Sequence, residues 1–431
     1  MSDVNRVYAE RLLREAELEA LVVFQPEAFR YVVGAPAGVA TMWGRAGAAI
    51  ALVPADASKG LAAIASDHAA GAIRAIAPDM DLRTHRIWID MVDLRGAETL
   101  EHRTEKWKPV FGKIRCENKN LDQINTAYQH SGSTDPRPET FDRATCFGLL
   151  SELLTERGLH QAHIGVDLEF MPAADFEALK QAIPAVTWLD GSQVLRRMRA
   201  VKSEREITRL RNAARAAEAG LVRMASEVKL GASIATFSAA WKDGALNAAR
   251  EAGFSLSGHW DFISVGADLS DSSAIVTPGA LIKADVGTLV DGYSSDGART
   301  FTYGSATSLA HKVFAALETA FAAGLEQLKP GNTFGSVHAA MQASMRKDGF
   351  LHYDRGHFGH SVGGGAGIED WPFFSSGNQE TILPNMVVAL EAPFYGQGLG
   401  ALMIEDQFLI TDSSAECMNT LPRTLRDLSL R

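Results

Sequence analysis

An Asp-Gly pair between two apolar runs constrains the fold of this chain more than any other feature of its sequence. Asp291 and Gly292 lie in the middle of residues 282–303, which read IKADVGTLVDGYSSDGARTFTY. This pattern predicts a tight β-hairpin, because Asp and Gly accept the positive φ angles that a two-residue turn demands. In such a hairpin position i pairs with position 583 minus i. The segment is therefore expected to form two adjacent antiparallel strands.

The predicted register brings two carboxylates to one face of the hairpin. Asp296 lies opposite Gly287, and Asp285 lies two residues from Gly287 on the same strand. Because alternate residues share a face, the two aspartates become diagonal neighbours with backbones about 7–8 Å apart. Carboxylates placed in this way can share two divalent cations about 3.5–4 Å apart. The hairpin is therefore a candidate metal-binding element.

A second acidic pair interrupts two otherwise apolar strands. Residues 385–411 read NMVVALEAPFYGQGLGALMIEDQFLIT, and a hairpin centred on Gly398 would place Glu391 opposite Glu405. A lone carboxylate is costly to bury, and it either shifts its pKa or acquires a compensating partner. A bound metal ion would remove this cost.

A histidine completes the candidate ligand set. His360 lies in the glycine-rich segment RGHFGHSVGGGAGIEDWP, where glycines let the backbone approach a site closely. Four carboxylates and one imidazole suit Mn²⁺, Co²⁺, Fe²⁺ or Zn²⁺, and their negative charge would balance two dications. A single histidine among oxygen donors argues against a structural zinc site. The glycines do not have the GxGxxG spacing of a dinucleotide-binding loop.

The chain divides into two regions of different pattern. Its first part alternates short apolar strands with amphipathic helices, as is typical of an α/β domain, with a polar excursion over about 79–142. A capping box at Ser203 and Glu206 then begins a long amphipathic helix, and strands and helices follow in separate blocks. The sequence therefore predicts an α/β domain over 1–198 and an α+β domain over 199–431.

Composition argues against several classes of partner. The chain has 42 Lys and Arg against 52 Asp and Glu, a formal charge of -10, and its basic residues form no long run. Nucleic acid and anionic membranes are therefore poor partners. Three scattered cysteines, no apolar leader and no apolar run of about 18 residues predict a soluble protein of the cytoplasm.

The order and spacing of the candidate ligands resemble those of the pita-bread metallopeptidases, which include methionine aminopeptidases, prolidases, Xaa-Pro aminopeptidases and creatinase. The segments KSEREITRLRNAA, GYSSDGARTF, KPGNTF and IEDQFLIT are close to the motifs of that family. The similarity covers about Ser203 to Pro422. The first domain is similar in size and pattern to the N-terminal domain of the creatinase and prolidase branch. The resemblance implies a pita-bread catalytic domain preceded by a creatinase-type α/β domain.

The same resemblance implies a set of roles. Two divalent metal ions would be bound by Asp285, Asp296, His360, Glu391 and Glu405. The expected activity is hydrolysis of a C–N bond, of an amide or Xaa-Pro type, by a metal-bridging hydroxide. Glu391 would carry a proton to the leaving nitrogen. The expected substrate is a dipeptide or another small molecule, and the branch implies a homodimer.

Three positions depart from the peptidase pattern. Ser272 and Ser273 lie where prolidases carry a histidine before the first aspartate. A second histidine, expected about seven residues after the ligand histidine, is replaced by the run from Gly367 to Asp370. Met403 takes the place of an arginine. Groups that face the substrate in the family have therefore changed, whereas all five ligand types are present.

These departures leave alternatives open. In a peptidase, His357, His259 or Glu369 could donate a hydrogen bond to the tetrahedral oxyanion. In a metal-dependent lyase or a non-peptide hydrolase, like the family's dimethylsulfoniopropionate lyase or creatinase, Tyr293 could act as a base, and the segment EDWP is similar to one in the lyase branch. A third possibility is a metal-binding protein without turnover. The candidate catalytic residues are thus Glu391, His357, Tyr293 and Glu369.

Overall fold

The computed structural model describes residues 2–89 and 136–430, which form two compact units. Glu17–Gly191 makes most of the N-terminal unit, and Ser192–Arg431 together with Asp3–Ala16 makes the C-terminal unit. The sequence placed the boundary after residue 198 and assigned the first residues to the first domain, and those domain limits stay a prediction. Most of the polar excursion predicted over 79–142 lies outside the described residues.

The N-terminal unit is built on one mixed sheet with strand order β4-β3-β2-β1-β5-β6. The central strand β1 pairs antiparallel with β2 and parallel with β5. Its four residues are all buried, and the apolar face of α5 packs on the same core. The strands are β1 (Ala20–Val23), β2 (Ile50–Pro54), β3 (Ala62–Ser66), β4 (Asp81–His85), β5 (His163–Val166) and β6 (Thr187–Asp190). The helices are α2 (Pro26–Val33), η1 (Gly38–Trp43), α3 (Asp67–Ile76), α5 (Arg143–Glu156) and α6 (Ala173–Ala182).

The C-terminal unit is built on a ten-stranded sheet whose main path runs β12-β11-β13-β14-β10-β8-β7, with neighbours antiparallel. Three short strands pair with strands of this path: β9 pairs with β8, β15 with β14 and β16 with β10. The strands are β7 (Gly258–Val265), β8 (Ala280–Val290), β9 (Tyr293–Ser294), β10 (Ala298–Tyr303), β11 (His357–Ser361), β12 (Asp370–Ser375), β13 (Val387–Gly396), β14 (Gly400–Ile410), β15 (Ala415–Cys417) and β16 (Arg426–Asp427).

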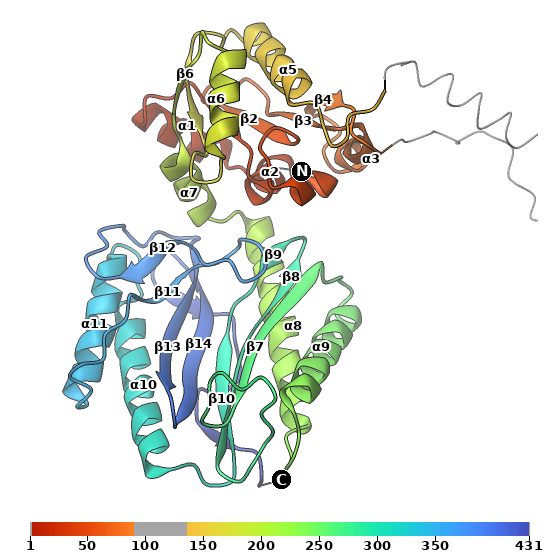
Figure 1. Cartoon of the computed structure of the whole chain (residues 1–431). Helices are drawn as coiled ribbons and strands as arrows, with labels where there is room; N and C mark the ends of the chain where they lie inside the picture. The colour runs from red at the N-terminus through yellow and green to blue at the C-terminus, as the bar shows by residue number, and fades with distance from the viewer. Residues whose placement is uncertain (1, 90–135, 431) are drawn as a thin grey trace, which may run out of the picture. The chain divides into compact units, whose positions relative to one another are not determined.

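Two helix pairs cover this sheet (Figure 1). Helices α10 and α11 bury an apolar core against β13 and β14, and α8 and α9 bury another against β8. The unit's helices are α1 (Arg6–Glu15), α7 (Ser192–Ala200), α8 (Glu204–Ser226), α9 (Ile234–Glu251), α10 (Ser308–Gln327) and α11 (Phe334–Lys347). A curled antiparallel sheet flanked by helices is the α+β pita-bread architecture that the sequence predicted. Over the part of the chain that is described, none of the helices has the length and apolar character needed to cross a bilayer.

Both predicted hairpin registers are confirmed. Val290 pairs with Tyr293 across the turn and Asp285 pairs with Ala298, each pair summing to 583. Asp291 adopts a positive φ of 49°, as the two-residue turn requires. In the second hairpin Glu391 lies directly opposite Glu405. The turn chemistry and the apolar pattern therefore determined which side chains share a face.

The entry to α8 is tied to the strand that carries His360. Ser203 and Glu206 form the predicted capping box, with the Ser203 N–H donating to Glu206 Oε2 at 2.8 Å. Lys202, immediately before the cap, is 4% exposed, and its Nζ donates to Ser361 Oγ at 2.9 Å. Burial lowers the pKa of the Lys202 ammonium to about 8. One desolvated lysine thus links the start of the long helix to β11.

Replacing Lys202 by Met should change how stability depends on pH. The pKa of Lys202 is about 8 in the folded chain and near 10.5 in an unfolded one. Between these values the unfolded chain binds a proton that the folded chain does not, so the free energy of unfolding of the wild type rises with pH. The rise is about 3 kcal/mol. Urea titrations across this pH range should show it in the wild type and not in Lys202→Met, and an equal rise in both proteins contradicts the assignment.

Candidate metal centre

One row of residues crosses four neighbouring strands and carries three of the predicted ligands. Asp285 on β8 pairs with Ala298 on β10, Ala298 pairs with Glu405 on β14, and Glu405 pairs with Glu391 on β13. Residues directly opposite one another point to the same face of a sheet. Three carboxylates therefore project from one face, and the small side chain of Ala298 leaves space between them.

Asp296 enters this space from the loop before β10. It lies two residues before Ala298, and its backbone N–H donates to Gln407 Oε1 at 3.3 Å. Gly287 makes this approach possible, because a Cβ at that position would overlap the carbonyl oxygen of Ser295 and the ring of Trp260. Asp296 thus comes close to the strand of Asp285, as predicted, because the backbone at Ser295 packs closely against Gly287.

His360 reaches the same face from β11. It pairs with Ala389 on β13, two residues before Glu391. The preceding Gly359 has φ +116°, and a Cβ there would overlap the carbonyl oxygen of Ala389. His360 Nδ1 lies 2.9 Å from the carbonyl oxygen of Ser361, which can only accept a hydrogen bond. The ring proton therefore sits on Nδ1, and Nε2 presents a lone pair to the carboxylates.

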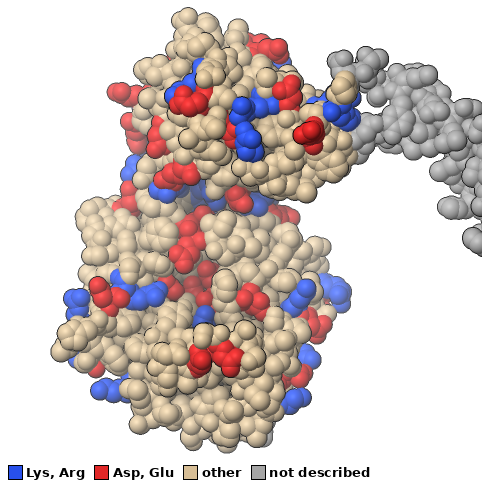
Figure 2. Space-filling view, viewed as in Figure 1, with Lys and Arg blue, Asp and Glu red and all other residues tan. Residues whose placement is uncertain are grey.

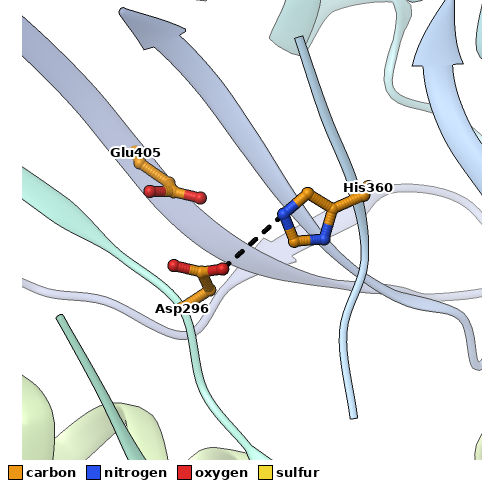
Figure 3. A group of neighbouring side chains, drawn as sticks. All are labelled: Asp296, His360 and Glu405. Atoms are coloured by element: carbon orange, nitrogen blue, oxygen red, sulfur yellow. Dashed lines mark ion pairs between the residues drawn. The ribbon is translucent and has the colours of Figure 1, made fainter. Parts of the chain in front are cut away.

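Three of the predicted ligands converge on one point (Figure 3). One ligand atom each from Asp296, His360 and Glu405 lies within 4.8 Å of the others, and His360 Nε2 is 3.6 Å from Asp296 Oδ2. Glu405 is 2% exposed, and its buried Oε2 has no hydrogen-bond partner. A buried carboxylate oxygen without a partner is costly unless a cation satisfies it. The donor set therefore fits a divalent metal ion.

The electrostatics of the cluster lead to the same conclusion. Burial, and then the negative charge of neighbouring carboxylates, raise the pKa values of Asp296 and Glu405 well above their usual ranges. Carboxylates in this situation take up protons or bind a cation. A divalent ion is the better solution near neutral pH, because it neutralises several of them together.

The other two predicted ligands flank this cluster and have cationic partners. Lys283 Nζ lies 3.0 Å from Asp285 Oδ2. Arg355 Nη2 lies 3.1 Å from Glu391 Oε1, and His357 Nδ1 lies 3.2 Å from the same oxygen. Burial alone would raise the pKa of Glu391, but His357 and Arg355 outweigh it and hold that pKa below its usual range. Glu391 is therefore ionised at neutral pH.

Buried charges on the opposite face of β14 also help to position Glu405. Asp406, its neighbour on the opposite face of β14, is 1% exposed and pairs with Arg299 Nη2 at 2.6 Å and with Arg423. Arg299 Nη1 also donates to the backbone carbonyl of Glu405 at 2.8 Å. The position of the Glu405 backbone therefore depends on an ion-pair network.

Two predicted catalytic residues lie at the edge of the cluster. His357 bridges two carboxylates, with Nδ1 next to Glu391 and Nε2 3.4 Å from Glu369. The hydrogen bond with Glu391 raises the pKa of His357. Glu369 is more exposed than His357. His357 is thus positioned next to the ligands, and Glu369 contacts it from the solvent side.

Two other candidates lie elsewhere. The Tyr293 hydroxyl donates to Asp3 Oδ2 at 3.0 Å, and its ring packs in an apolar cluster with Val362 and Ala389. His259 is exposed, and its ring lies edge-on to Trp241, which α9 carries. A base role for Tyr293 and an oxyanion role for His259 are therefore not supported by the structure. The sequence did not reveal that the Tyr293 hydroxyl donates a hydrogen bond to Asp3.

Aromatic side chains and acidic groups line the open face of the sheet. Phe262, 61% exposed, pairs with Asp285, and its ring lies 5.4 Å from Trp260. Tyr395, 50% exposed, lies on the face of Glu391, and Phe373 packs on His357. Figure 2 shows Asp and Glu side chains gathered near the middle of the visible face of the C-terminal unit. A small ligand with apolar and cationic groups would match such a surface.

A groove of about 730 Å³ lies elsewhere, on the outer side of α8 and α9, where Arg215, Val222 and Phe254 line it. None of its lining residues belongs to the predicted ligand set. The groove is therefore separate from the candidate metal centre.

Several residues next to the candidate metal centre were not identified from the sequence. Lys283 lies two residues before Asp285 on one strand, so the period of two already predicted a shared face. Arg355 lies five residues before His360, and no local pattern connects it to Glu391. Phe262 and Tyr395 read as ordinary strand residues, since their exposure depends on the sheet's curvature.

The chain is similar to known metallopeptidases along both units. Residues 208–412 match the Metallopeptidase family M24, and residues 123–201 match the Creatinase/Prolidase N-terminal domain. The putative dipeptidase YkvY of Bacillus subtilis is 24% identical over 66% of this chain and 78% of its own length. The probable dipeptidase PepE of Mycobacterium bovis is 29% identical over 59% of this chain and 68% of its own length.

Solved structures share the fold. Dipeptidase PepE from Mycobacterium ulcerans superposes with a TM-score of 0.71 at 21% identity, covering 98% of this chain and 96% of its own. At that identity the similarity establishes the architecture alone. Both sequence matches and this architecture agree with the ligand geometry described above. The chain belongs to the pita-bread metallopeptidase family, in its creatinase and prolidase branch, and is a metal-dependent hydrolase.

Proposed function

We propose that this protein is a dipeptidase that cleaves the C–N bond of a dipeptide, with Xaa-Pro dipeptides as the first substrates to test. The observation that carries the proposal is the convergence of Asp296, His360 and Glu405 around a buried oxygen without a partner. Similar proteins named dipeptidase or Xaa-Pro dipeptidase support the choice of substrate class. The expected homodimer and cytoplasmic location stay predictions.

Asp296, His360 and Glu405 would hold a divalent cation. Such an ion polarises a carbonyl oxygen and lowers the pKa of water, so that hydrolysis can proceed near neutral pH. Five ligand residues of this kind could bind two ions, as the sequence predicted. The number depends on whether Asp285, which pairs with Lys283, is available.

Glu391 is suited to move a proton. Its lowered pKa keeps it ionised, and Oε1 accepts contacts from Arg355 Nη2 and His357 Nδ1. A general base must be ionised and close to the proton that it accepts. Glu391 would accept a proton from the water that attacks the peptide carbonyl and would then donate this proton to the leaving nitrogen.

His357 is suited to donate a hydrogen bond to the developing oxyanion. Its raised pKa favours the protonated ring, and its Nε2 faces the more exposed side, where Glu369 contacts it. A donor aimed at developing negative charge stabilises the transition state more than the ground state. Glu369 would be a positioning residue that orients the ring. Phe262 and Tyr395 would pack on the apolar part of the substrate.

An altered substrate is the second candidate function. The three departures from the prolidase pattern, including Met403 in place of an arginine, motivate it. A lyase or a hydrolase of a non-peptide compound would use the same ligands. Product analysis separates these activities, because a lyase forms an unsaturated product, whereas a hydrolase incorporates oxygen from ¹⁸O-labelled water.

Hydrolysis should depend on Asp296. We expect Asp296→Asn to lower kcat/KM for Xaa-Pro dipeptides by more than about 100-fold, because even groups behind metal ligands contribute about 10–100-fold. Chelation of the wild type should abolish activity, and Mn²⁺ or Co²⁺ should restore it. Asp243→Asn, on an exposed carboxylate of α9, is the matched control. If no proline dipeptide is cleaved but a non-peptide sulfonium or ammonium zwitterion is turned over, the altered-substrate function is favoured.

Metal binding should also stabilise the protein through Glu405. At a hundred times its Kd, Mn²⁺ should stabilise the wild type by about 2.7 kcal/mol. Glu405→Gln should lose most of this gain, and the metal-free variant should be more stable than the metal-free wild type because a strained buried carboxylate has been removed. Thermal unfolding with and without Mn²⁺ measures both effects. Glu416→Gln, a surface carboxylate paired with Arg211, is the control.

His357 should affect turnover without affecting metal content. We expect His357→Gln to lower kcat by on the order of 100-fold, the typical effect of removing one oxyanion donor. Glu369→Gln should have a smaller effect, within about tenfold. Steady-state kinetics together with metal analysis test this. A His357→Gln protein that has lost its metal would instead make His357 a ligand.

A further inference from the structure

Lys283 occupies an unusual place for a lysine. It lies on β8 between the buried residues Ile282 and Ala284 and is only 5% exposed. Its Nζ is 3.0 Å from Asp285 Oδ2 and donates to the carbonyl oxygen of Phe262 at 3.3 Å. The ring of Tyr395 lies 5.8 Å away. A buried ammonium is therefore held against one of the predicted metal ligands.

This position conflicts with a second metal ion. Asp285 lies outside the cluster of Asp296, His360 and Glu405, and a second ion that used it as a ligand would have to lie next to it. The Lys283 ammonium already lies against Asp285, so a dication there would meet a like charge at short range. Displacing the ammonium would leave it buried without a carboxylate partner, which is strongly unfavourable.

The charge of the site gives the same answer. Asp285, Asp296, Glu391 and Glu405 contribute four negative charges, and the ion-paired Lys283 and Arg355 return two positive ones. The remaining charge of minus two would be balanced by a single divalent cation. Two dications would leave a buried site with a net positive charge.

We propose that this site holds one divalent cation, at Asp296, His360 and Glu405, and that the Lys283 ammonium takes the place of a second cation next to Asp285. The inference rests on the metal site of the proposed function and differs from the count of two ions predicted from the sequence. Three observations carry it: the Lys283–Asp285 ion pair, the burial of Lys283, and the three-residue ligand cluster, which does not include Asp285.

Metal stoichiometry tests this proposal. The full chain is stripped with chelator, loaded with Mn²⁺, passed over a desalting column and measured by elemental analysis against protein concentration. We expect one ion per chain in the wild type. Lys283→Met keeps the length and packing of the side chain but removes the charge, and it should double the content to two ions per chain. Lys283→Arg retains the charge and should stay at one.

Electron paramagnetic resonance gives an independent readout. One Mn²⁺ per chain yields the hyperfine pattern of an isolated ion, whereas a pair yields the denser pattern of exchange-coupled ions. The wild type and Lys283→Arg should show the first, and Lys283→Met the second. Circular dichroism confirms that each variant is folded, and the wild-type count decides the question even if Lys283→Met does not fold.

The outcomes separate this inference from the proposed function. Two ions in an active wild type would overturn the role of Lys283 and leave the dipeptidase proposal intact. One ion in the wild type and still one in folded Lys283→Met would show that Lys283 does not exclude the second ion. One ion without turnover of any dipeptide would support the metal count while contradicting the proposed substrate. No bound ion would overturn both.

Discussion

The main constraint on the C-terminal unit is that several like charges are buried on one face of its sheet. Four carboxylates project into the same space, and burial raises the pKa values of Asp296 and Glu405 well above their usual ranges. Such an arrangement is destabilising unless protons or cations neutralise it. The apolar cores that the two helix pairs form on the opposite face of the sheet supply the stability that this face does not, since their helices bury large side chains against β13, β14 and β8.

The neutralising charges come from different parts of the chain. Lys283 belongs to the first hairpin, and Arg355 precedes β11. Behind the site, Arg299 and Arg423 hold Asp406 and thereby the backbone of Glu405. The site is thus embedded in a charge network whose members lie on both faces of β14. A bound cation would neutralise the negative charge that the protein's own cationic side chains do not balance.

Much of this arrangement could be predicted from the sequence, because local rules determine it. The turn at Asp291 and Gly292 set one register, and Gly398 set the other, so the carboxylates that share a face followed from counting. The long helix α8 followed from its capping box and its apolar periodicity. The placement of His360 relative to the strands did not follow, because it depends on a long-range pairing of β11 with β13.

What the sequence could not provide was the set of contacts made between distant segments. Arg355 and Glu391, or Tyr293 and Asp3, meet only after the chain has folded. The base role suggested for Tyr293 finds no support for a physical reason: its hydroxyl donates to Asp3, a residue 290 positions away along the chain. Lys283 was a different case, because the strand period already placed it beside Asp285 and only its burial was hidden.

The placement of the first helix makes the C-terminal unit discontinuous in sequence. Asp3–Ala16 belongs to the unit that otherwise begins at Ser192, and Asp3 pairs there with Arg209 at 2.8 Å. Most of the N-terminal unit, Glu17–Gly191, therefore lies in sequence between two pieces of the other, and the chain leaves the C-terminal unit after Ala16 and returns to it at Ser192. A gene fragment that starts at Ser192 would lack a piece of its own fold, so isolating the catalytic unit requires fusing the first sixteen residues to it rather than cutting between the two.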